Sequence, residues 1–444
     1  MADEGRGTFL RVLEAWREAF GGPSFLRAKT LARGWLLSTG AHRVTAALVA
    51  AGVSGHLHHE AFHRFFSRAK WCPDELGRLL FLRLETLLAR AGSLDVVLDD
   101  TLAEKPRGPK IFGRGSHLDA VRSSRRHHVL SFGHVWVVLA IRVQLPFASR
   151  PWALPLLFRL YRNERECEAR GDAHRKKTEL ARDMLDVFAT WTDRRVRVLA
   201  DQAYCCNTVQ RDLDERFVLF GAMRADAVLT ALPPPNDKPK PGRPRKRGDL
   251  LPKPEAHAAN PAVPWLPVNV TLYGRPQTVW VKSMLAQWYQ VCGERLLHVV
   301  IVRIDGGTLP WRVFFAVDPD AMVADILEAY AGRWSIEATF RALKQHLGFA
   351  DSPARLRLAV ERTAPFAALL LTTLAIWALE RPGDPSLLLV PLRPWYAQKR
   401  GLSVEDLVLA AKRDLLAVSD PPGRFDDLRL IPRTRMSVPH QRAP

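Results

Sequence analysis

The sequence predicts an α/β fold in which a mixed β-sheet is flanked by helices. Apolar runs rich in valine, isoleucine and leucine at 94–101, 129–146 and 152–161 predict three successive strands. A helix is expected over 178–192, and the run RRVRVLADQAY that follows predicts a fourth strand with Asp201 at its end. A sheet whose strands are joined first by turns and then by a helix accounts for this order.

Several short helices are expected before the first strand. Their ranges are 9–20, 28–40, 44–53, 58–69 and 74–92. Asp74 stands where a helix N-cap is expected. Arginine and histidine side chains on the exposed faces of these helices would suit contact with DNA phosphates. A purely structural helical cap would show the same pattern, so both interpretations stay open.

The chain is strongly basic. Its 444 residues include 65 Lys and Arg against 46 Asp and Glu, a formal charge of +19. Such an excess indicates a polyanionic partner, and nucleic acid is the expected one. Five cysteines without metal-ligand spacing indicate a reducing compartment and argue against a zinc site. No secretory leader is expected, and the apolar run 364–379 is shorter than the ~20 residues of a membrane span. We therefore expect a cytoplasmic protein without a membrane partner.

Residues 233–258 are rich in proline, glycine, lysine and arginine, which predicts an extended basic linker. Four of its cations lie in GRPRKRG and are candidates for contact with a nucleic-acid backbone: Arg243, Arg245, Lys246 and Arg247. A solvated connector is the alternative interpretation.

A β-rich insertion is expected after the linker. A helix over 205–215 and a strand over 216–229 precede the linker, and 265–317 then alternates like strands. Turn signals stand at 273–276 and 305–307. This insertion accounts for the long separation between Asp201 and the next acidic helix.

The segment 329–349 predicts one continuous helix with two distinct faces. At about 100° per residue, five polar side chains fall on one arc of about 80°: Tyr330, Arg333, Glu337, Arg341 and Lys344. Four apolar side chains fall on a second arc that would dock the helix: Ile336, Phe340, Leu343 and Leu347. One carboxylate would then stand among three cations and a phenol. A solvated face with an Arg–Glu pair four residues apart is the alternative.

Two further acids stand at the ends of predicted strands. They are Asp100 in VVLDDT and Asp201 in VLADQAY. Together with the Y-R-E-K spacing of the predicted helix, they give a sequence that resembles the DDE transposases of bacterial insertion sequences, which are cut-and-paste enzymes. The resemblance covers roughly 94–379. It implies an RNase H-like core, in which the first and fourth strands lie side by side and bring their acids together.

The resemblance implies that Asp100, Asp201 and Glu337 are the catalytic residues, with Asp99 as an alternative to Asp100. Three convergent carboxylates repel one another unless divalent cations lie between them, and oxygen-only ligation favours magnesium or manganese over zinc. Two ions per site are expected. They would activate the attacking oxygen and stabilise the leaving oxygen of a phosphodiester.

The resemblance also implies roles in DNA binding. Arg333 and Lys344 would position phosphates beside Glu337, with Arg341 on the same face, and Tyr330 would hydrogen-bond a phosphate next to the cut. An aromatic residue of the insertion would stack on an unstacked base, although core packing is the alternative for each candidate. The candidates are Trp265, Trp280, Trp288 and Tyr289. The implied partners are transposon terminal inverted repeats and target DNA, bound by a homodimer in the bacterial nucleoid.

Five segments are expected. They are a helical DNA-binding domain (1–92), the first part of the catalytic core (93–230), the linker and β-rich insertion (231–320), the second part of the core (321–381) and a C-terminal helical region with a basic tail (382–444). We expect an interruption at Pro365 in the second part of the core, and a helix over 404–417. The expected function is that of a DNA transposase that cleaves transposon ends and transfers them to target DNA. An RNase H-like nuclease without strand transfer and a domesticated, non-catalytic DNA-binding protein are the alternatives.

Overall fold

A computed structural model describes residues 8–417, apart from 89–91, 109, 125, 235–244, 304–309, 382–394, 396–398 and 400. Five strands form the first half of its sheet. They are β1 (Leu94–Glu104), β3 (Leu130–Val143), β4 (Trp152–Tyr161), β5 (Val196–Ala200) and β6 (Phe217–Ala222). β3 pairs antiparallel with both β1 and β4, whereas β5 runs parallel to β1 and β6. Helix α7 (Lys177–Ala189) lies between β4 and β5 in the chain. The predicted order of three strands, a helix and a fourth strand is therefore confirmed.

The first strand differs from its prediction in length. β1 does not end at Thr101 but continues to Glu104, because residues 101–104 pair with 133–136 of β3. Asp99 and Asp100 therefore lie inside a strand, just beyond the last residue of β1 that pairs with β5. A short strand that the sequence does not predict, β2 (Gly115–Leu118), pairs with the outer part of β3.

The predicted β-rich insertion is present. Its strands are β7 (Leu266–Leu272), β8 (Arg275–Gln287), β9 (Leu296–Arg303) and β10 (Arg312–Ala316), accompanied by α9 (Pro254–Ala259) and α10 (Tyr289–Cys292). The β7–β8 hairpin turns at Tyr273 and Gly274, whose φ angles of 54° and 75° are typical of a two-residue hairpin turn. The predicted turn at 273–276 is confirmed, and the one at 305–307 lies outside the described residues.

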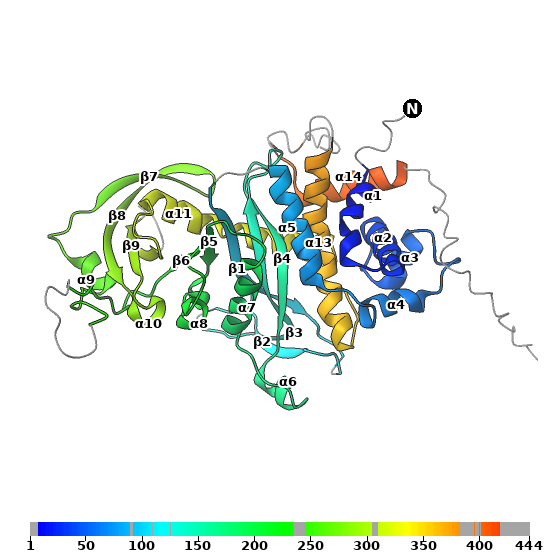
Figure 1. Ribbon diagram of the computed structural model, residues 1–444, viewed down its shortest axis with the longest axis horizontal. Helices are drawn as coiled ribbons and strands as arrows, with labels where there is room; N and C mark the ends of the chain where they lie inside the picture. The colour runs from blue at the N-terminus through cyan, green and yellow to red at the C-terminus, as the bar shows by residue number, and fades with distance from the viewer. Residues whose placement is uncertain are drawn as a thin grey trace, which may run out of the picture.

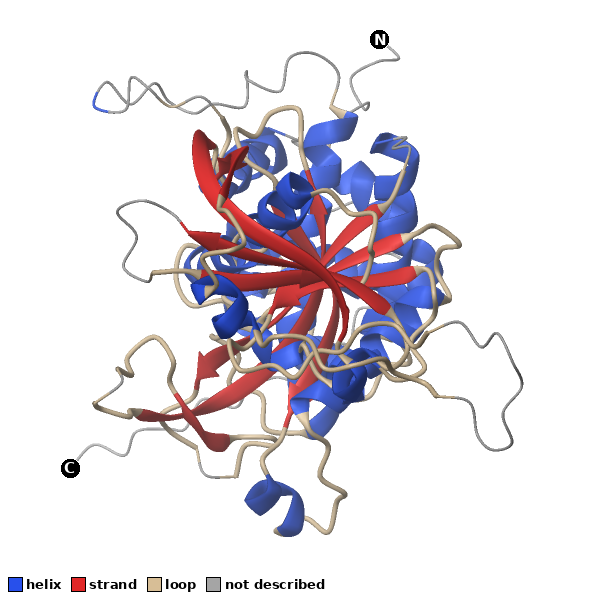
Figure 2. Cartoon of the chain, turned by 90° about the vertical axis from the view of Figure 1, so that its left-hand side faces the viewer, coloured by secondary structure: helices blue, strands red, loops and turns tan. Residues whose placement is uncertain are grey.

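The insertion extends the core sheet instead of forming a separate one. β10 pairs antiparallel with β6, so that the strand order across the described residues is β2-β3-β1-β5-β6-β10-β9-β8-β7, with β4 beside β3. Figure 1 shows the insertion strands at the opposite end of the molecule from the N-terminal helices. In Figure 2 the strands form a twisted fan with helices around it. The predicted class, a mixed sheet flanked by helices, is confirmed.

The N-terminal region is helical, as predicted. Its elements are α1 (Phe9–Val12), the 3-10 helix η1 (Leu13–Ala19), α2 (Gly22–Leu37), α3 (Val44–Ala50), α4 (His59–Ser67) and α5 (Pro73–Leu88). Aromatic side chains from this region surround Phe366 of α13 (Arg357–Glu380): Trp16, Trp35, Phe65, Phe66 and Trp71. The helical region and the core therefore share one hydrophobic interior.

Helix α13 runs through Pro365 without ending, contrary to the predicted interruption. The packing of its flanking residues offsets the ~3 kcal/mol that a proline costs inside a helix. Among the described helices, α13 alone is long and apolar enough to cross a membrane, and 89% of its most apolar stretch is buried inside the protein. A buried core helix passes the same test of length and composition.

The predicted helix 329–349 is broken into two. Helix α11 (Val323–Gly332) ends before α12 (Ser335–His346) begins. The backbone N–H groups of Arg333 and Trp334 bond to carbonyls three residues back, at Tyr330 and Ala331. This tighter turn interrupts the regular rotation of about 100° per residue of an α-helix. Tyr330 therefore does not share one regular helical face with Glu337. The correction leaves Glu337, Arg341 and Lys344 together on α12.

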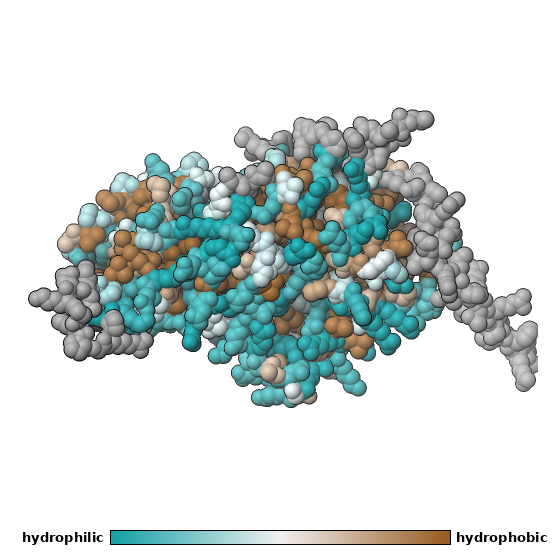
Figure 3. Space-filling model, viewed as in Figure 1, coloured by the Kyte–Doolittle hydropathy of each residue, from teal (hydrophilic) through white to brown (hydrophobic). Residues whose placement is uncertain are grey.

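The remaining helices are short or peripheral. They are α6 (Glu164–Glu168), the 3-10 turn η2 (Gln202–Tyr204), α8 (Asn207–Gln210) and α14 (Val404–Ala417). The prediction of α14 is confirmed, whereas the predicted helix 205–215 is only one turn long. Figure 3 shows a mainly hydrophilic face with hydrophobic residues visible in several places, including over the insertion.

Candidate active site

The ends of two parallel strands place Asp99 and Asp201 side by side. Leu98 of β1 pairs with Ala200 of β5, and each aspartate is the next residue of its chain. Side chains at paired positions of a sheet point to the same face. Asp99 and Asp201 therefore point to one side of the sheet, and Asp100 points to the other.

Three carboxylates surround the guanidinium of Arg333. Its Nη1 lies 2.8 Å from Oδ2 of Asp99, and its Nη2 lies 3.6 Å from Oε1 of Glu337 and 3.9 Å from Oδ1 of Asp201. The Arg333 side chain is only 10% exposed, whereas those of Asp201 and Glu337 are 44% and 39% exposed. The acids thus form a site that is open to solvent at Asp201 and Glu337 and is closed at Asp99.

Asp100 takes part in a different cluster. Its Oδ2 accepts a 2.7 Å hydrogen bond from Nζ of Lys177 on α7, and its Oδ1 accepts one of 2.7 Å from the hydroxyl of Tyr204. Of the sequence candidates, the structure therefore brings Asp201 and Glu337 together with Asp99, the alternative, and not with Asp100. The physical reason is strand alternation, because the face of β1 that carries Asp99 is the one that α12 covers.

The electrostatics of the site favour an added cation. Burial raises the pKa of Asp99 to about 7, and the neighbouring carboxylates of Asp100 and Asp201 add to this although Arg333 opposes it. Burial also raises the pKa of Glu337, with Asp201 adding to the effect and Arg333 and Arg341 opposing it. One guanidinium is not enough to hold these groups at their ordinary pKa values. More positive charge near the acids would stabilise their ionised forms.

The donor atoms at this site suit magnesium or manganese, because all three side chains are carboxylates. Their arrangement in the DNA-free chain does not suit a metal ion, because Arg333 lies where the carboxylates converge. Within the described residues, no three acidic, histidine or cysteine side chains are close enough together to hold a metal ion. A divalent ion would therefore require the Arg333 side chain to move.

The other predicted residues of the helix lie near the site. The Tyr330 ring packs on Phe314 with 4.5 Å between ring centroids, and the guanidinium of Arg333 lies 5.5 Å from its centroid. Arg341 and Lys344 are exposed on α12, and neither forms an ion pair with a described residue. They are available to a polyanion that approaches this helix.

The predicted aromatic residues are mostly engaged in packing. Trp288 is 8% exposed and contacts Phe315 edge to face. Cations cover Trp265, because Lys282 and Arg303 lie 4.9 and 5.1 Å from its ring centroid. Trp280 is half-buried on β8.

The basic linker makes local contacts. Arg245 pairs with Asp249 at 2.8 Å, Lys246 pairs with Glu294, and Arg247 lies 5.5 Å from the ring centroid of Tyr289. Arg243 lies outside the described residues. The three described cations of GRPRKRG therefore already have partners within the linker and insertion.

Sequence reasoning missed several residues around the acids. Tyr204 and Lys177 hold Asp100, and Tyr204 had a signal, since it follows Asp201 by three residues in ADQAY. An exposed aromatic pair also lies beside the site: the Tyr273 ring at the hairpin tip meets Trp334 with 6.3 Å between ring centroids. That contact joins residues about sixty positions apart, and no local pattern reveals it.

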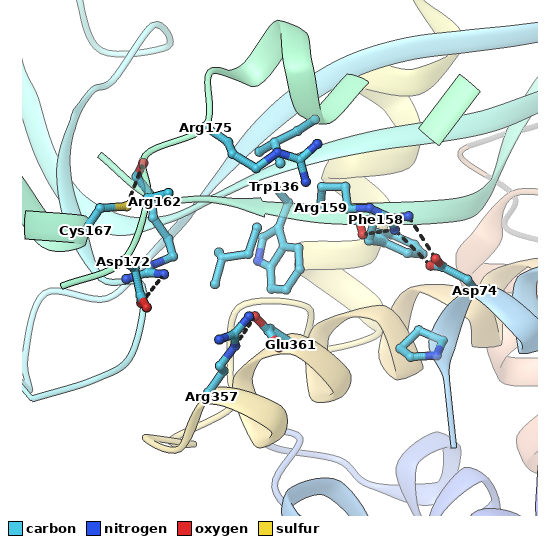
Figure 4. Close-up of a pocket in the computed structure, with 14 residues that line it drawn as sticks. Asp74, Trp136, Phe158, Arg159, Arg162, Cys167, Asp172, Arg175, Arg357 and Glu361 are labelled. Atoms are coloured by element: carbon cyan, nitrogen blue, oxygen red, sulfur yellow. Dashed lines mark hydrogen bonds and ion pairs between the residues drawn. The ribbon is translucent and has the colours of Figure 1, made fainter. Parts of the chain in front are cut away.

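A separate cavity of about 470 Å³ lies between β4, α13 and the segment before α7 (Figure 4). Four arginines line it, and each is paired with an acid: Arg159 with Asp74, Arg162 with Asp172, Arg175 with Asp183, and Arg357 with Glu361. The cavity contains none of the three acids around Arg333. Because each of these arginines already has an acidic partner, we assign the candidate active site to the acids around Arg333 and not to this cavity.

The family model described as "DDE superfamily endonuclease" matches residues 18–279. The match covers more than half of the chain, and the protein belongs to this family. Asp99, Asp100 and Asp201 lie inside the matched range, and Glu337 lies beyond it.

The chain is similar to the piggyBac transposase in a cryo-EM structure of its synaptic complex with hairpin DNA, at 9% identity, over 98% of this chain and 87% of that chain, with a TM-score of 0.42. No curated protein sequence matches the chain.

Proposed function

We propose that this endonuclease is a DNA transposase of a bacterial insertion sequence. It would cleave at the terminal inverted repeats of its element and transfer the freed ends into target DNA. The observation that carries the proposal is the convergence of Asp99, Asp201 and Glu337 on Arg333, in a chain of the DDE superfamily. The charge of +19 supports DNA as the substrate.

The proposed cofactor is magnesium or manganese, two ions per site, held by Asp99, Asp201 and Glu337. Such ions lower the pKa of an attacking water or hydroxyl and stabilise charge on the leaving oxygen. The chain's own residues orient the substrate. Arg333 offers a planar fork of donors that suits a phosphate, and Lys344 offers a point charge on α12, about two turns beyond Glu337. Tyr330, packed beside Arg333, can donate its hydroxyl to the next phosphate.

On the other face of β1, Lys177 and Tyr204 hold Asp100. We propose that they keep this fourth carboxylate away from the ions and fix the strand that carries Asp99. Trp334 and Tyr273 lie at the edge of the site, where an end of the duplex would enter. The chain would act as a homodimer on DNA in the bacterial nucleoid, since two ends have to be joined to one target. Sizing of the protein with end-bearing DNA tests this, because a 1:1 complex that joins both ends would contradict it.

The proposal is tested by incubating the protein with duplexes that carry the element's own ends, a target plasmid and Mg²⁺ or Mn²⁺. Cleavage at the ends followed by joining to the plasmid supports a transposase. Cleavage without joining would indicate a nuclease, and end binding without cleavage would indicate a non-catalytic DNA-binding protein. Asp201→Asn should abolish both reactions but leave end binding. Asp320→Asn, which removes an exposed acid outside the site, is the matched control.

A further inference from the structure

The centre of the acid site is occupied by the protein's own cation. Arg333 reaches it from the short turn between α11 and α12, and its side chain is 10% exposed. Asp99, Asp201 and Glu337 all lie within 3.9 Å of its guanidinium. In the DNA-free chain, a divalent ion and this guanidinium would compete for the same oxygens.

The guanidinium is incompletely satisfied in this position. Only its contact with Asp99 has the length of a hydrogen bond, at 2.8 Å, whereas those with Glu337 and Asp201 are 3.6 and 3.9 Å. Its Nε is buried and has no hydrogen-bond partner among the described residues. A buried donor without an acceptor is unfavourable. A phosphate could accept two parallel hydrogen bonds from the fork and would improve on this arrangement.

The direction in which Arg333 could leave is also defined. Asp99 lies at the buried end of the site, and the better exposed side chains of Asp201 and Glu337 lie at the open end. A DNA phosphate approaching from solvent would therefore arrive on the Asp201 and Glu337 side. The backbone N–H of Arg333 bonds to the Tyr330 carbonyl, so its side chain can turn outward without loss of the turn.

We propose that Arg333 is the resident counter-ion of the acids in the DNA-free protein, and that divalent ions bind only after a DNA phosphate draws its guanidinium out of the site. The inference rests on the proposed function and adds that metal binding depends on DNA. Metal and DNA then raise each other's affinity by the same factor, because coupling between two sites is reciprocal. The free protein would be protected from metal-dependent reactions until a backbone is in place.

The test measures Mn²⁺ binding by the loss of the EPR signal of free Mn²⁺. Wild-type protein is titrated alone and with saturating duplex DNA, and the complex of Asp201→Asn with the same duplex corrects for Mn²⁺ held by DNA. We expect the wild-type site to bind Mn²⁺ at least about tenfold more tightly with DNA than without it, within the usual range of coupling between sites. Equal affinity in the two states would overturn the proposal.

Arg333→Gln removes the counter-ion and keeps a polar but shorter side chain. Without DNA, this variant should bind Mn²⁺ about tenfold more tightly than wild type, a change of the usual size for coupled sites. Arg341→Gln is the matched control in this DNA-free arm, because it removes a charge that also acts on Glu337 but lies outside the cluster. An identical change in both variants would show a general field effect and would overturn the proposal.

The wild-type comparison does not use Arg333→Gln, so misfolding of that variant would not affect its outcome. Equal Mn²⁺ affinity with and without DNA, in a protein that still cleaves its ends, overturns only the dependence on DNA. Absence of Mn²⁺ binding in every state overturns this inference and the proposed metal site together.

Discussion

Nη1 of Arg333 lies 2.8 Å from Oδ2 of Asp99, although 234 positions separate the two residues in the chain. Asp100, the next residue, instead accepts hydrogen bonds from Lys177 and Tyr204. This contact selects one of two adjacent aspartates for the group that includes Asp201 and Glu337.

We therefore expect Asp99→Asn to lose metal-dependent nicking of end-bearing DNA by a factor of 100 or more, on the order of what a ligand to a catalytic ion supplies. Asp100→Asn should retain most of the activity. Nicking rates at saturating Mg²⁺ measure both, with filter binding to show that DNA is still bound. If Asp100→Asn is the inactive variant, the role belongs to Asp100 and Asp99 only anchors Arg333.

Tyr204→Phe should destabilise the protein. The hydroxyl is buried and donates to a carboxylate at 2.7 Å, and loss of a hydrogen bond to a charged group costs about 1.5–3 kcal/mol. Urea unfolding measures the change. Tyr273→Phe removes an equivalent hydroxyl from a side chain that is 56% exposed, and should change stability little. Equal effects of the two substitutions would contradict the assigned hydrogen bond.

The protein should lose stability on mild acidification through His134. Burial, assisted by Lys105 and His117, lowers the pKa of His134 to about 4, against the opposing hydrogen bond to Phe112 and the charge of Glu166. The unfolded chain then binds more protons than the folded one between about pH 6.5 and pH 4, so stability falls as pH falls through that window.

His134→Gln keeps a donor for the Phe112 carbonyl but does not titrate. Its free energy of unfolding should therefore depend less on pH than that of wild type, by on the order of 2–3 kcal/mol between pH 7 and pH 4. Thermal or urea unfolding at the two pH values measures the difference. Parallel curves for the variant and wild type would exclude His134 as a source of acid sensitivity.

The basic linker should contribute only part of its charge to DNA binding. Replacement of Arg243, Arg245, Lys246 and Arg247 by Ala would flatten the salt dependence by up to about four units if every side chain neutralised a phosphate. Because Arg245 and Lys246 already pair with acids, we expect a change of less than about two units. Binding isotherms at several salt concentrations measure the slope. A change in slope near four units would mean that these ion pairs open when DNA binds. An unchanged slope would mean that GRPRKRG is only a solvated connector.

Local patterns predicted most of the strands and their order. The runs that became β3, β4 and β5, the hairpin turn at Tyr273 and the helix at 404–417 each depend on neighbouring residues. Asp201 and Glu337 were also found in this way, because one follows an apolar strand and the other stands at a helical spacing from cations.

Other features depend on long-range contacts. The choice between Asp99 and Asp100 depends on which of them points to the same face of the sheet as Asp201, and only the pairing of β1 with β5 determines that. The break between α11 and α12 at Arg333 changes the direction of the Tyr330 side chain relative to that of Glu337. A helical wheel assumes one continuous helix and cannot show this change. The union of insertion and core depends on the pairing of β10 with β6, whose residues lie about ninety positions apart.

The central claim is that Asp99, Asp201 and Glu337 hold ions at one site when DNA is bound. Iron-mediated cleavage of the protein backbone in the complex with end-bearing DNA tests it directly. Fe²⁺ takes the place of Mg²⁺, ascorbate and peroxide generate hydroxyl radicals, and mass spectrometry identifies the cut sites. We predict backbone cuts clustered in three distant parts of the chain, close to Asp99, Asp201 and Glu337, that disappear when excess Mg²⁺ is added. Cuts near only one of these residues, or elsewhere in the chain, would contradict a shared metal site.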